Sequence, residues 1–259
     1  MIETTQTRSE PRKRFRITLG GMMVFVLVIG VWLGWFVRRA RVQRQAVAAI
    51  VKAGGDVVYG WDYRTVVRGP RWLRELIGVD YFDTVTGINA NKPAVDDAVV
   101  AQIGRLAQVR ALGLQGSTVT DAGLAHLAGM TELRVLRIRS PNVNGSGFRH
   151  LSGLRRLSSL HFARTPITDE NLAYLRPLST IQKISLYDTR ITDAGMKHLA
   201  DLKGLRELWV ANTDVGDEGL RELGRIQRPI TVHAWAKTRI TPAGIEAMKR
   251  LAPGMVILP

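Results

Sequence analysis

The stretches IQKISLYDTRITDAGM (residues 181–196) and LRELWVANTDVGDEGL (residues 205–220) repeat one pattern of apolar, threonine and acidic positions, 24 residues apart. The same step connects Leu112, Leu136, Leu160, Ile184 and Leu208. Further apolar rows keep the same phase, including Leu114, Ile138, Phe162, Leu186 and Val210. A fixed period of this length is the signature of a repeat architecture.

Each repeat combines two kinds of spacing. Leu133, Leu136 and Ile138 lie near period two, which predicts a short strand, whereas Phe148, Leu151 and Leu154 follow at period three, which predicts a short helix. One turn alone cannot be stable, since ordering it costs about 1.5 kcal/mol per residue and a few apolar side chains return about 2 kcal/mol each. The turns must therefore stack into a solenoid with one continuous core.

The repeats extend over residues 85–259 as about seven turns and a closing strand at Met255 to Leu258. Keeping the phase in the last turn requires one inserted residue before Ile230, which places His233 and Trp235 at buried positions. Two polar rows also recur, and we interpret both as structural. Thr120-Asp121, Thr168-Asp169 and Thr192-Asp193 precede the helices as capping residues, and Thr165, Thr189, Thr213 and Thr238 follow the strands, where their hydroxyls can bond to the backbone.

The pattern L-x-x-L-x-L-x-x-T-x-I-T-D-x-G-L-x-x-L resembles the leucine-rich repeat, nearest to the cysteine-containing subclass found in F-box proteins, with Thr in place of the usual Asn or Cys. The resemblance covers Val85 to Leu258. Together with an apolar N-terminal segment and the stretch Trp72 to Gly78, it looks like bacterial membrane-anchored repeat proteins. The resemblance implies an α/β horseshoe with a parallel sheet on its concave side, and it implies partner binding rather than a reaction.

Residues 17–37 contain no charged side chain, and a helix of this length spans the hydrocarbon core of a bilayer, about 30 Å. We predict one transmembrane helix here, preceded by a basic tail at residues 1–16; a cleavable signal peptide is the alternative. Basic residues flank the segment on both sides, so the positive-inside count does not decide orientation. A basic tail leading into an apolar stretch is typical of a signal-anchor, which predicts an exported, periplasmic or extracellular repeat domain.

The charge is concentrated near this segment. The chain has 37 Lys and Arg against 22 Asp and Glu, and the first 44 residues hold nine basic and two acidic side chains. Polybasic flanks can contact anionic lipid headgroups, so the charge does not require a nucleic-acid partner, and we expect none. Residues 38–84 are predicted as a juxtamembrane helix, ending at Gly54-Gly55, and an N-terminal cap. In that cap, a strand over residues 56–63 and a short helix from Pro70 are expected, with Trp72, Leu76 and Tyr81 covering the first turn.

Outward strand positions of a leucine-rich repeat sheet meet ligands, and their side chains can be read from the repeat. Lys183 should face Glu207, and Arg164 should face Asp188, so these charges neutralise each other. Arg137 and Arg139 have no acidic neighbour in register, with His161 alongside and with Tyr187 and Trp209 beyond small residues. These five residues are the predicted ligand-binding cluster, suited to a carboxylate-bearing or sugar-like ligand; the alternative is a solvated face.

The sequence shows no G-x-S-x-G elbow, phosphate-binding loop, HExxH motif or dinucleotide fingerprint, and the chain has no cysteine. His126, His150 and His198 share one helix position, but only two are adjacent, so a metal site is not expected. We predict a non-enzymatic, membrane-anchored recognition protein without cofactor, metal or catalytic residues, whose concave face binds a protein or an acidic cell-envelope polymer. The alternative is a cytoplasm-facing substrate-recognition adaptor for a ubiquitin-ligase-like or other degradation or modification machinery.

Overall fold

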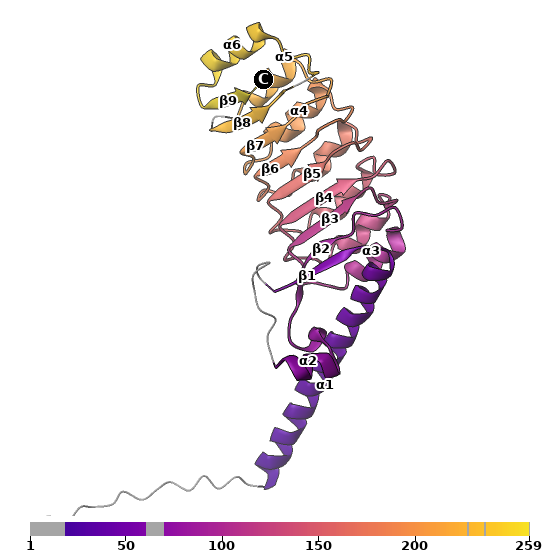
Figure 1. Cartoon of the computed structure of the whole chain (residues 1–259). Helices are drawn as coiled ribbons and strands as arrows, with labels where there is room; N and C mark the ends of the chain where they lie inside the picture. Colours follow the sequence, from indigo (N-terminus) through magenta and orange to yellow (C-terminus); the bar gives the residue numbers. More distant parts are fainter. Residues whose placement is uncertain (1–18, 61–69, 227, 236, 259) are drawn as a thin grey trace, which may run out of the picture. The chain divides into compact units, whose positions relative to one another are not determined.

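The computed structural model describes residues 19–60, 70–226, 228–235 and 237–258. It contains two compact units, residues 1–39 and residues 40–259. The basic tail and the first residues of the predicted membrane segment lie outside the described residues, as do part of the predicted cap strand and Pro259. The second unit is a solenoid built around one nine-stranded sheet (Figure 1).

The strands of the sheet stand in chain order, β1 to β9. Only β1 and β2 pair antiparallel; every later pair is parallel. The strands are β1 (Asp56–Tyr59), β2 (Val85–Asn89), β3 (Ala111–Gln115), β4 (Val135–Arg139), β5 (Ser159–Phe162), β6 (Lys183–Ser185), β7 (Glu207–Trp209), β8 (Ile230–His233) and β9 (Met255–Leu258). The predicted parallel-sheet solenoid is thus confirmed.

The 24-residue step appears directly in the strand register. Leu112 pairs with Leu136, Leu136 with Leu160, and Leu160 with Ile184. These side chains are at most 1% exposed and belong to one hydrophobic core. Each turn places its core residues at the same positions as its neighbours, so the stacked turns share one interior and stabilise each other.

Short helices return the chain behind the sheet (Figure 1). They are α-helical in some turns and 3-10 helical in others, and 3-10 helices are usually short. The helical elements of the solenoid are α2 (Arg71–Ile77), η1 (Val79–Tyr81), α3 (Asp97–Ile103), η2 (Gly123–Leu127), η3 (Ser146–Leu151), η4 (Glu170–Leu175), α4 (Asp193–Ala200), α5 (Asp217–Leu223) and α6 (Pro242–Leu251).

Threonines of both rows bond as predicted, but the aspartates bond to the next turn rather than capping their own helices. Thr192 Oγ1 accepts from Ala194 N at the start of α4. Asp193 Oδ1 instead accepts from Gly216 N at 2.7 Å and Gly219 N at 2.9 Å, both in the next turn. The same link between successive turns is made by Asp97, Asp121, Asp169 and Asp217. This aspartate ladder satisfies backbone donors that the helix starts leave free.

The ladder is broken at Gly145, which stands where the turns before and after it have Asp121 and Asp169. In the intact turns a glycine faces the incoming carboxylate; a Cβ on Gly195 would lie 2.4 Å from Asp169 Oδ1. The turn after Gly145 receives no carboxylate, and there Asn171 replaces the glycine and donates to Asn144 O at 3.1 Å. Aspartate and glycine are therefore matched between neighbouring turns.

The expected phase of the last turn is wrong. Val232, not His233, pairs with Leu208 and is fully buried, and Ala234 is buried in the next inward position. The extra residue therefore falls between Ala234 and Lys237, after the strand. His233 pairs in register with Trp209 and is half-buried, and Trp235 is 47% exposed.

The N-terminal end of the solenoid is closed differently from the prediction. Trp72 and Leu76 are 66% and 73% exposed, so they do not cover the first turn. The core there is instead completed by β1 and by Ala46 and Ile50, both fully buried, from the C-terminal part of α1 (Leu19–Lys52). Helix α1 ends at Lys52, and the chain turns at Gly54, whose φ of 78° suits a glycine.

The apolar part of α1 satisfies the length and composition of a membrane span. The candidate segment Met22–Lys52 has a hydropathy of 1.7 in its most apolar window, and none of that window is buried. Trp32 and Trp35, near the end of the uncharged segment, are both more than half exposed.

Candidate functional site

The outward-facing side of β4 to β8 carries the predicted cluster. Arg137 and Arg139 alternate along β4, with Leu136 and Ile138 turned inward, so both guanidinium groups are on the exposed side of the sheet. Residues two apart on a strand are about 7 Å from each other. His161 of β5 pairs in register with Arg137. The repeat spacing thus brings these three residues together as predicted.

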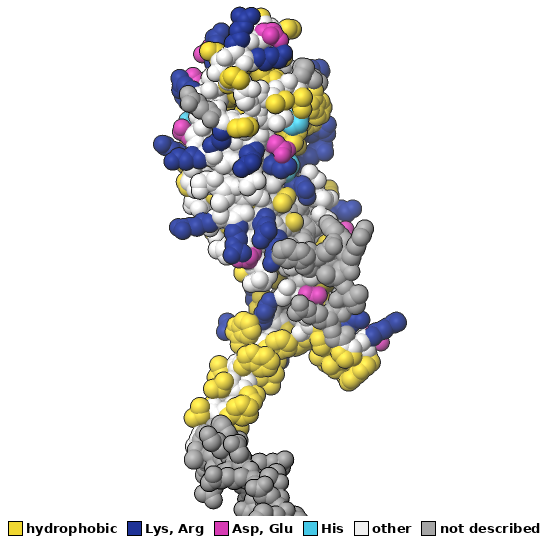
Figure 2. All heavy atoms as spheres, turned by 90° about the vertical axis from the view of Figure 1, so that its left-hand side faces the viewer, with side chains coloured by type: hydrophobic (Ala, Val, Ile, Leu, Met, Phe, Trp, Pro, Cys, Tyr) yellow, Lys and Arg dark blue, Asp and Glu magenta, His cyan; other side chains and the backbone are white. Residues whose placement is uncertain are grey.

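The neighbouring charges on this face neutralise each other as expected. Lys183 Nζ lies 2.7 Å from Glu207 Oε1, and Arg164 Nε lies 2.8 Å from Asp188 Oδ2. Within the described part of the chain, no ion pair involves Arg137 or Arg139. These two cations are therefore available to an anionic group from outside the chain. More widely, Lys and Arg side chains are prominent on the face of the solenoid shown in Figure 2.

Aromatic side chains continue the cluster across β5, β7 and β8. The rings of His161 and Trp209 have centroids 6.3 Å apart, across the small Ser185. Trp209 and His233 are stacked at 4.7 Å with an interplanar angle of 6°. His161, Trp209 and His233 thus form one continuous row of rings.

A second row lies beside the first, where the chain leaves the strands. Tyr187 and Trp235 have ring centroids 5.9 Å apart, and the residue between them in the repeat, Ala211, is fully buried. Sequence analysis missed His233 and Trp235 because it placed the inserted residue before β8. Continuing the 24-residue period from Trp209 and Ala211 without an insertion leads directly to His233 and Trp235.

The environment of His161 keeps its imidazole neutral. Burial lowers its pKa below the ordinary 6.5, and the positive charges of Arg137 and Lys183 lower the pKa further. Its Nε2 lies 2.9 Å from the Ser159 hydroxyl, which holds the ring in place. His161 therefore contributes an uncharged ring and a hydrogen-bonding group near neutral pH.

This arrangement offers groups that can bind a ligand. Two guanidinium groups can pair with carboxylates, and flat rings can stack on sugar or peptide groups. No group of three or more His, Asp or Glu side chains in the described ranges is arranged to hold a metal ion. The sheet face therefore offers charge and stacking surface.

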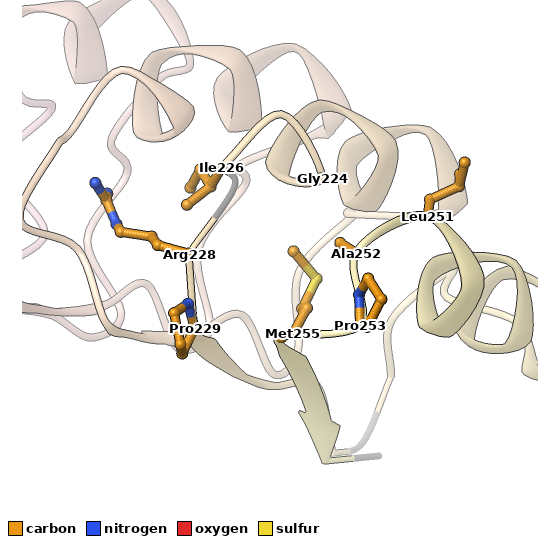
Figure 3. Close-up of a pocket in the computed structure, with 9 residues that line it drawn as sticks. Gly224, Ile226, Arg228, Pro229, Leu251, Ala252, Pro253 and Met255 are labelled. Carbon is orange, nitrogen blue, oxygen red and sulfur yellow. The ribbon is translucent and has the colours of Figure 1, made fainter.

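A separate hollow of about 300 Å³ lies near the C-terminal end of the solenoid (Figure 3). Ile226, Pro253 and Met255 give it an apolar wall. Arg228 also lines it, but Figure 3 shows its side chain running away from Met255, and its guanidinium donates to the carbonyls of Leu202 and Leu205. The charged group at this hollow is therefore already engaged within the chain.

A comparison with protein-family models finds no match, and neither does a comparison with curated proteins. Among solved structures, internalin C2 from Listeria monocytogenes is similar over 70% of this chain and 85% of its own, with a TM-score of 0.50 and 16% sequence identity. An internalin F structure from the same organism covers 61% and 56%, at 18% identity and a TM-score of 0.37.

A plant peptide hormone receptor, RGFR1 in complex with RGF2, covers 61% of this chain and 25% of its own, at 14% identity and a TM-score of 0.40. At these identities the likeness is one of fold. With the internalin C2 match, the solenoid is a leucine-rich repeat fold.

Proposed function

We propose that this protein is a non-enzymatic recognition protein, anchored in a membrane by the apolar part of α1, whose sheet face binds an acidic protein or cell-envelope polymer. Its resemblance to bacterial membrane-anchored repeat proteins agrees with this proposal. The observation that carries it is the pair Arg137 and Arg139, exposed, without an ion pair in the described chain, and bordered by two rows of rings.

Direct binding measurements test the sheet face. The probes are oligogalacturonate, which has a carboxylate on each sugar ring, and its neutral methyl ester. We expect the acid to bind and the ester to bind more weakly. In R137S/R139S, affinity for the acid should fall at least about tenfold, because a hydrogen bond to a charged group contributes roughly 1.5–3 kcal/mol.

A matched variant controls for loss of charge alone. R155S/R190S removes two arginines that are also exposed but lie off the strands. It should bind the acid nearly as well as the parent chain. If R137S/R139S binds like R155S/R190S, to oligogalacturonate and to a polyglutamate peptide alike, the sheet face is not the binding site.

Orientation separates this proposal from the cytoplasmic adaptor. With the N-terminus inside, the repeats are on the exported side, so protease added to cells whose outer envelope alone has been opened should digest them. Digestion only after the inner membrane is broken would favour the adaptor.

A further inference from the structure

Helix α2 presents an apolar pair that the solenoid does not use. Trp72 and Leu76 are four residues apart, so they lie on one face of the helix. They are 66% and 73% exposed, and the adjacent Ile77 is 37% exposed. Leu73 and Arg74, on the other side, are half-buried against the rest of the unit. The apolar face of α2 is therefore its outward face.

The end of α2 is fixed to α1 at one position. The Arg44 guanidinium donates to the carbonyl of Ile77, the last residue of α2, and lies 5.5 Å from the centroid of the Tyr81 ring. The preceding Gln43 donates from Nε2 to Asp80 Oδ1 at 3.1 Å and to the Asp83 carbonyl at 2.9 Å.

The same carboxylate is held from the sheet side. Tyr59 of β1 donates its hydroxyl to Asp80 Oδ1 at 3.0 Å, and the Asp80 side chain is only 9% exposed. Burial and the Asp80 charge raise the pKa of Tyr59, so its proton stays in this bond. α2 is thus attached firmly to the part of α1 around residues 43 and 44.

That attachment point is close to the membrane segment along the chain. Residue 44 follows the end of the uncharged stretch at Val37 by seven residues, which span about 10 Å as a helix. Headgroup layers extend roughly 5–8 Å beyond the hydrocarbon core on each side, so residue 44 lies just outside this layer, a few ångströms from its edge. Arg38, Arg39 and Arg41 lie in this short stretch and can attract anionic lipid.

We propose that α2 is an interfacial helix, with Trp72 and Leu76 inserted among the lipid headgroups next to the point where α1 leaves the bilayer. This inference rests on the proposed anchor function of α1. A lipid surface explains the exposed pair better than a protein partner does, because the arginines and the end of the uncharged segment lie within seven residues of Arg44 along the chain. Tryptophan is also enriched at membrane interfaces.

Spin labels on single cysteines test this directly, because the natural chain has no cysteine. The full chain is reconstituted into anionic phospholipid vesicles with one substitution at a time: L76C or W72C on α2, V28C in the apolar segment, and A247C on the exposed side of α6. Collision of each label with oxygen, which concentrates in lipid, is compared with collision with a water-soluble nickel complex.

We expect V28C to favour oxygen strongly, A247C to favour nickel, and L76C and W72C to be shifted clearly toward oxygen relative to A247C. If V28C favours nickel, α1 does not span the bilayer, and the anchor proposal fails together with this one. If V28C favours oxygen while L76C and W72C match A247C, the anchor stands and the interfacial helix is wrong. Labels at 72 and 76 that meet neither reagent would reveal a protein contact and also overturn the proposal.

Discussion

The two sides of the solenoid follow opposite rules. On the helical side, the same residue returns in turn after turn, and each copy bonds to the next turn; the copies are Asp97, Asp121, Asp169, Asp193 and Asp217. On the sheet face, one outward position changes chemistry at every step; its residues are Gly113, Arg137, His161, Ser185, Trp209 and His233. Stacking of the turns requires the repeated aspartates but places no constraint on the outward strand position. The helical side therefore maintains the structure, while the residues of the sheet face can vary for recognition.

Removing one rung of the ladder should have the largest effect on stability. In D193A, Gly216 N and Gly219 N lose their acceptor, and we expect unfolding free energy to fall by about 2 kcal/mol. Chemical denaturation of the full chain in detergent, followed by circular dichroism, measures this.

The matched variant removes a carboxylate from the other side. E207A breaks the Lys183–Glu207 pair, in which both side chains are at least 32% exposed. Exposed pairs contribute about 0–1 kcal/mol, so the loss should be much smaller than in D193A. Equal losses would contradict the division between the two sides.

The matched glycines provide a second test, of similar size. In G195A the added methyl group would lie within 2.4 Å of Asp169 Oδ1 and 2.9 Å of Ile191 Cγ2, so crowding should cost about 1–3 kcal/mol. N171G, at the equivalent position beside Gly145, loses one exposed side-chain bond and should cost less than about 1 kcal/mol. The comparison of the two denaturation midpoints is decisive; a harmless G195A would remove the explanation for the matched pairs.

On the sheet face, W209L should weaken ligand binding while leaving the fold intact. Leucine keeps apolar volume but removes the ring proposed to stack on the ligand, and aromatic contacts contribute about 0.5–1.5 kcal/mol beyond area. Affinity for oligogalacturonate should therefore fall by a factor of about 2–12. W72L, on α2, is the control and should bind like the parent chain.

The smallest expected effect is the pH dependence contributed by His161. Its folded pKa lies below the ordinary 6.5, so the folded protein resists protonation that the unfolded chain accepts. Stability from this group is complete above about pH 6.5 and is lost as pH falls toward the folded pKa. Thermal unfolding should show a steeper decline on acidification in the parent chain than in H161Q; parallel curves would mean that His161 is not perturbed.

Much of the fold is predictable from the sequence because apolar residues at a fixed period must take the same inward position in every turn to share one core. The spacing of Leu136 and Ile184 was enough to predict the strand register. The same spacing predicted the ion pairs of Glu207 with Lys183 and of Asp188 with Arg164. The last turn was less predictable, since Val232 and Ala234 fit one inward phase and His233 and Trp235 fit another, one residue later. Only packing selects between them, and that choice moved His233 and Trp235 onto the sheet face.

The closure of the N-terminal end was not predictable for a different reason. Large apolar side chains such as Trp72 and Leu76 resemble core residues in any sequence, whereas Ala46 is too small to stand out. In the structure Ala46, together with Ile50, nevertheless completes the core at this end. The binding role of Arg137 and Arg139 is a proposal. The residues in register with them on adjacent strands show that the two charges have no acidic partner there, and the identity of the ligand does not follow from that.

Side-chain footprinting tests the central claim most directly. Hydroxyl radicals oxidise exposed rings, and the chain offers Trp209 and Trp235 on the sheet face and Tyr174, 42% exposed, on the helical side. Saturating oligogalacturonate should lower the oxidation of Trp209 and Trp235 and leave Tyr174 unchanged. Protection of Tyr174 with unchanged tryptophans would place the ligand on the wrong side of the solenoid and contradict the account.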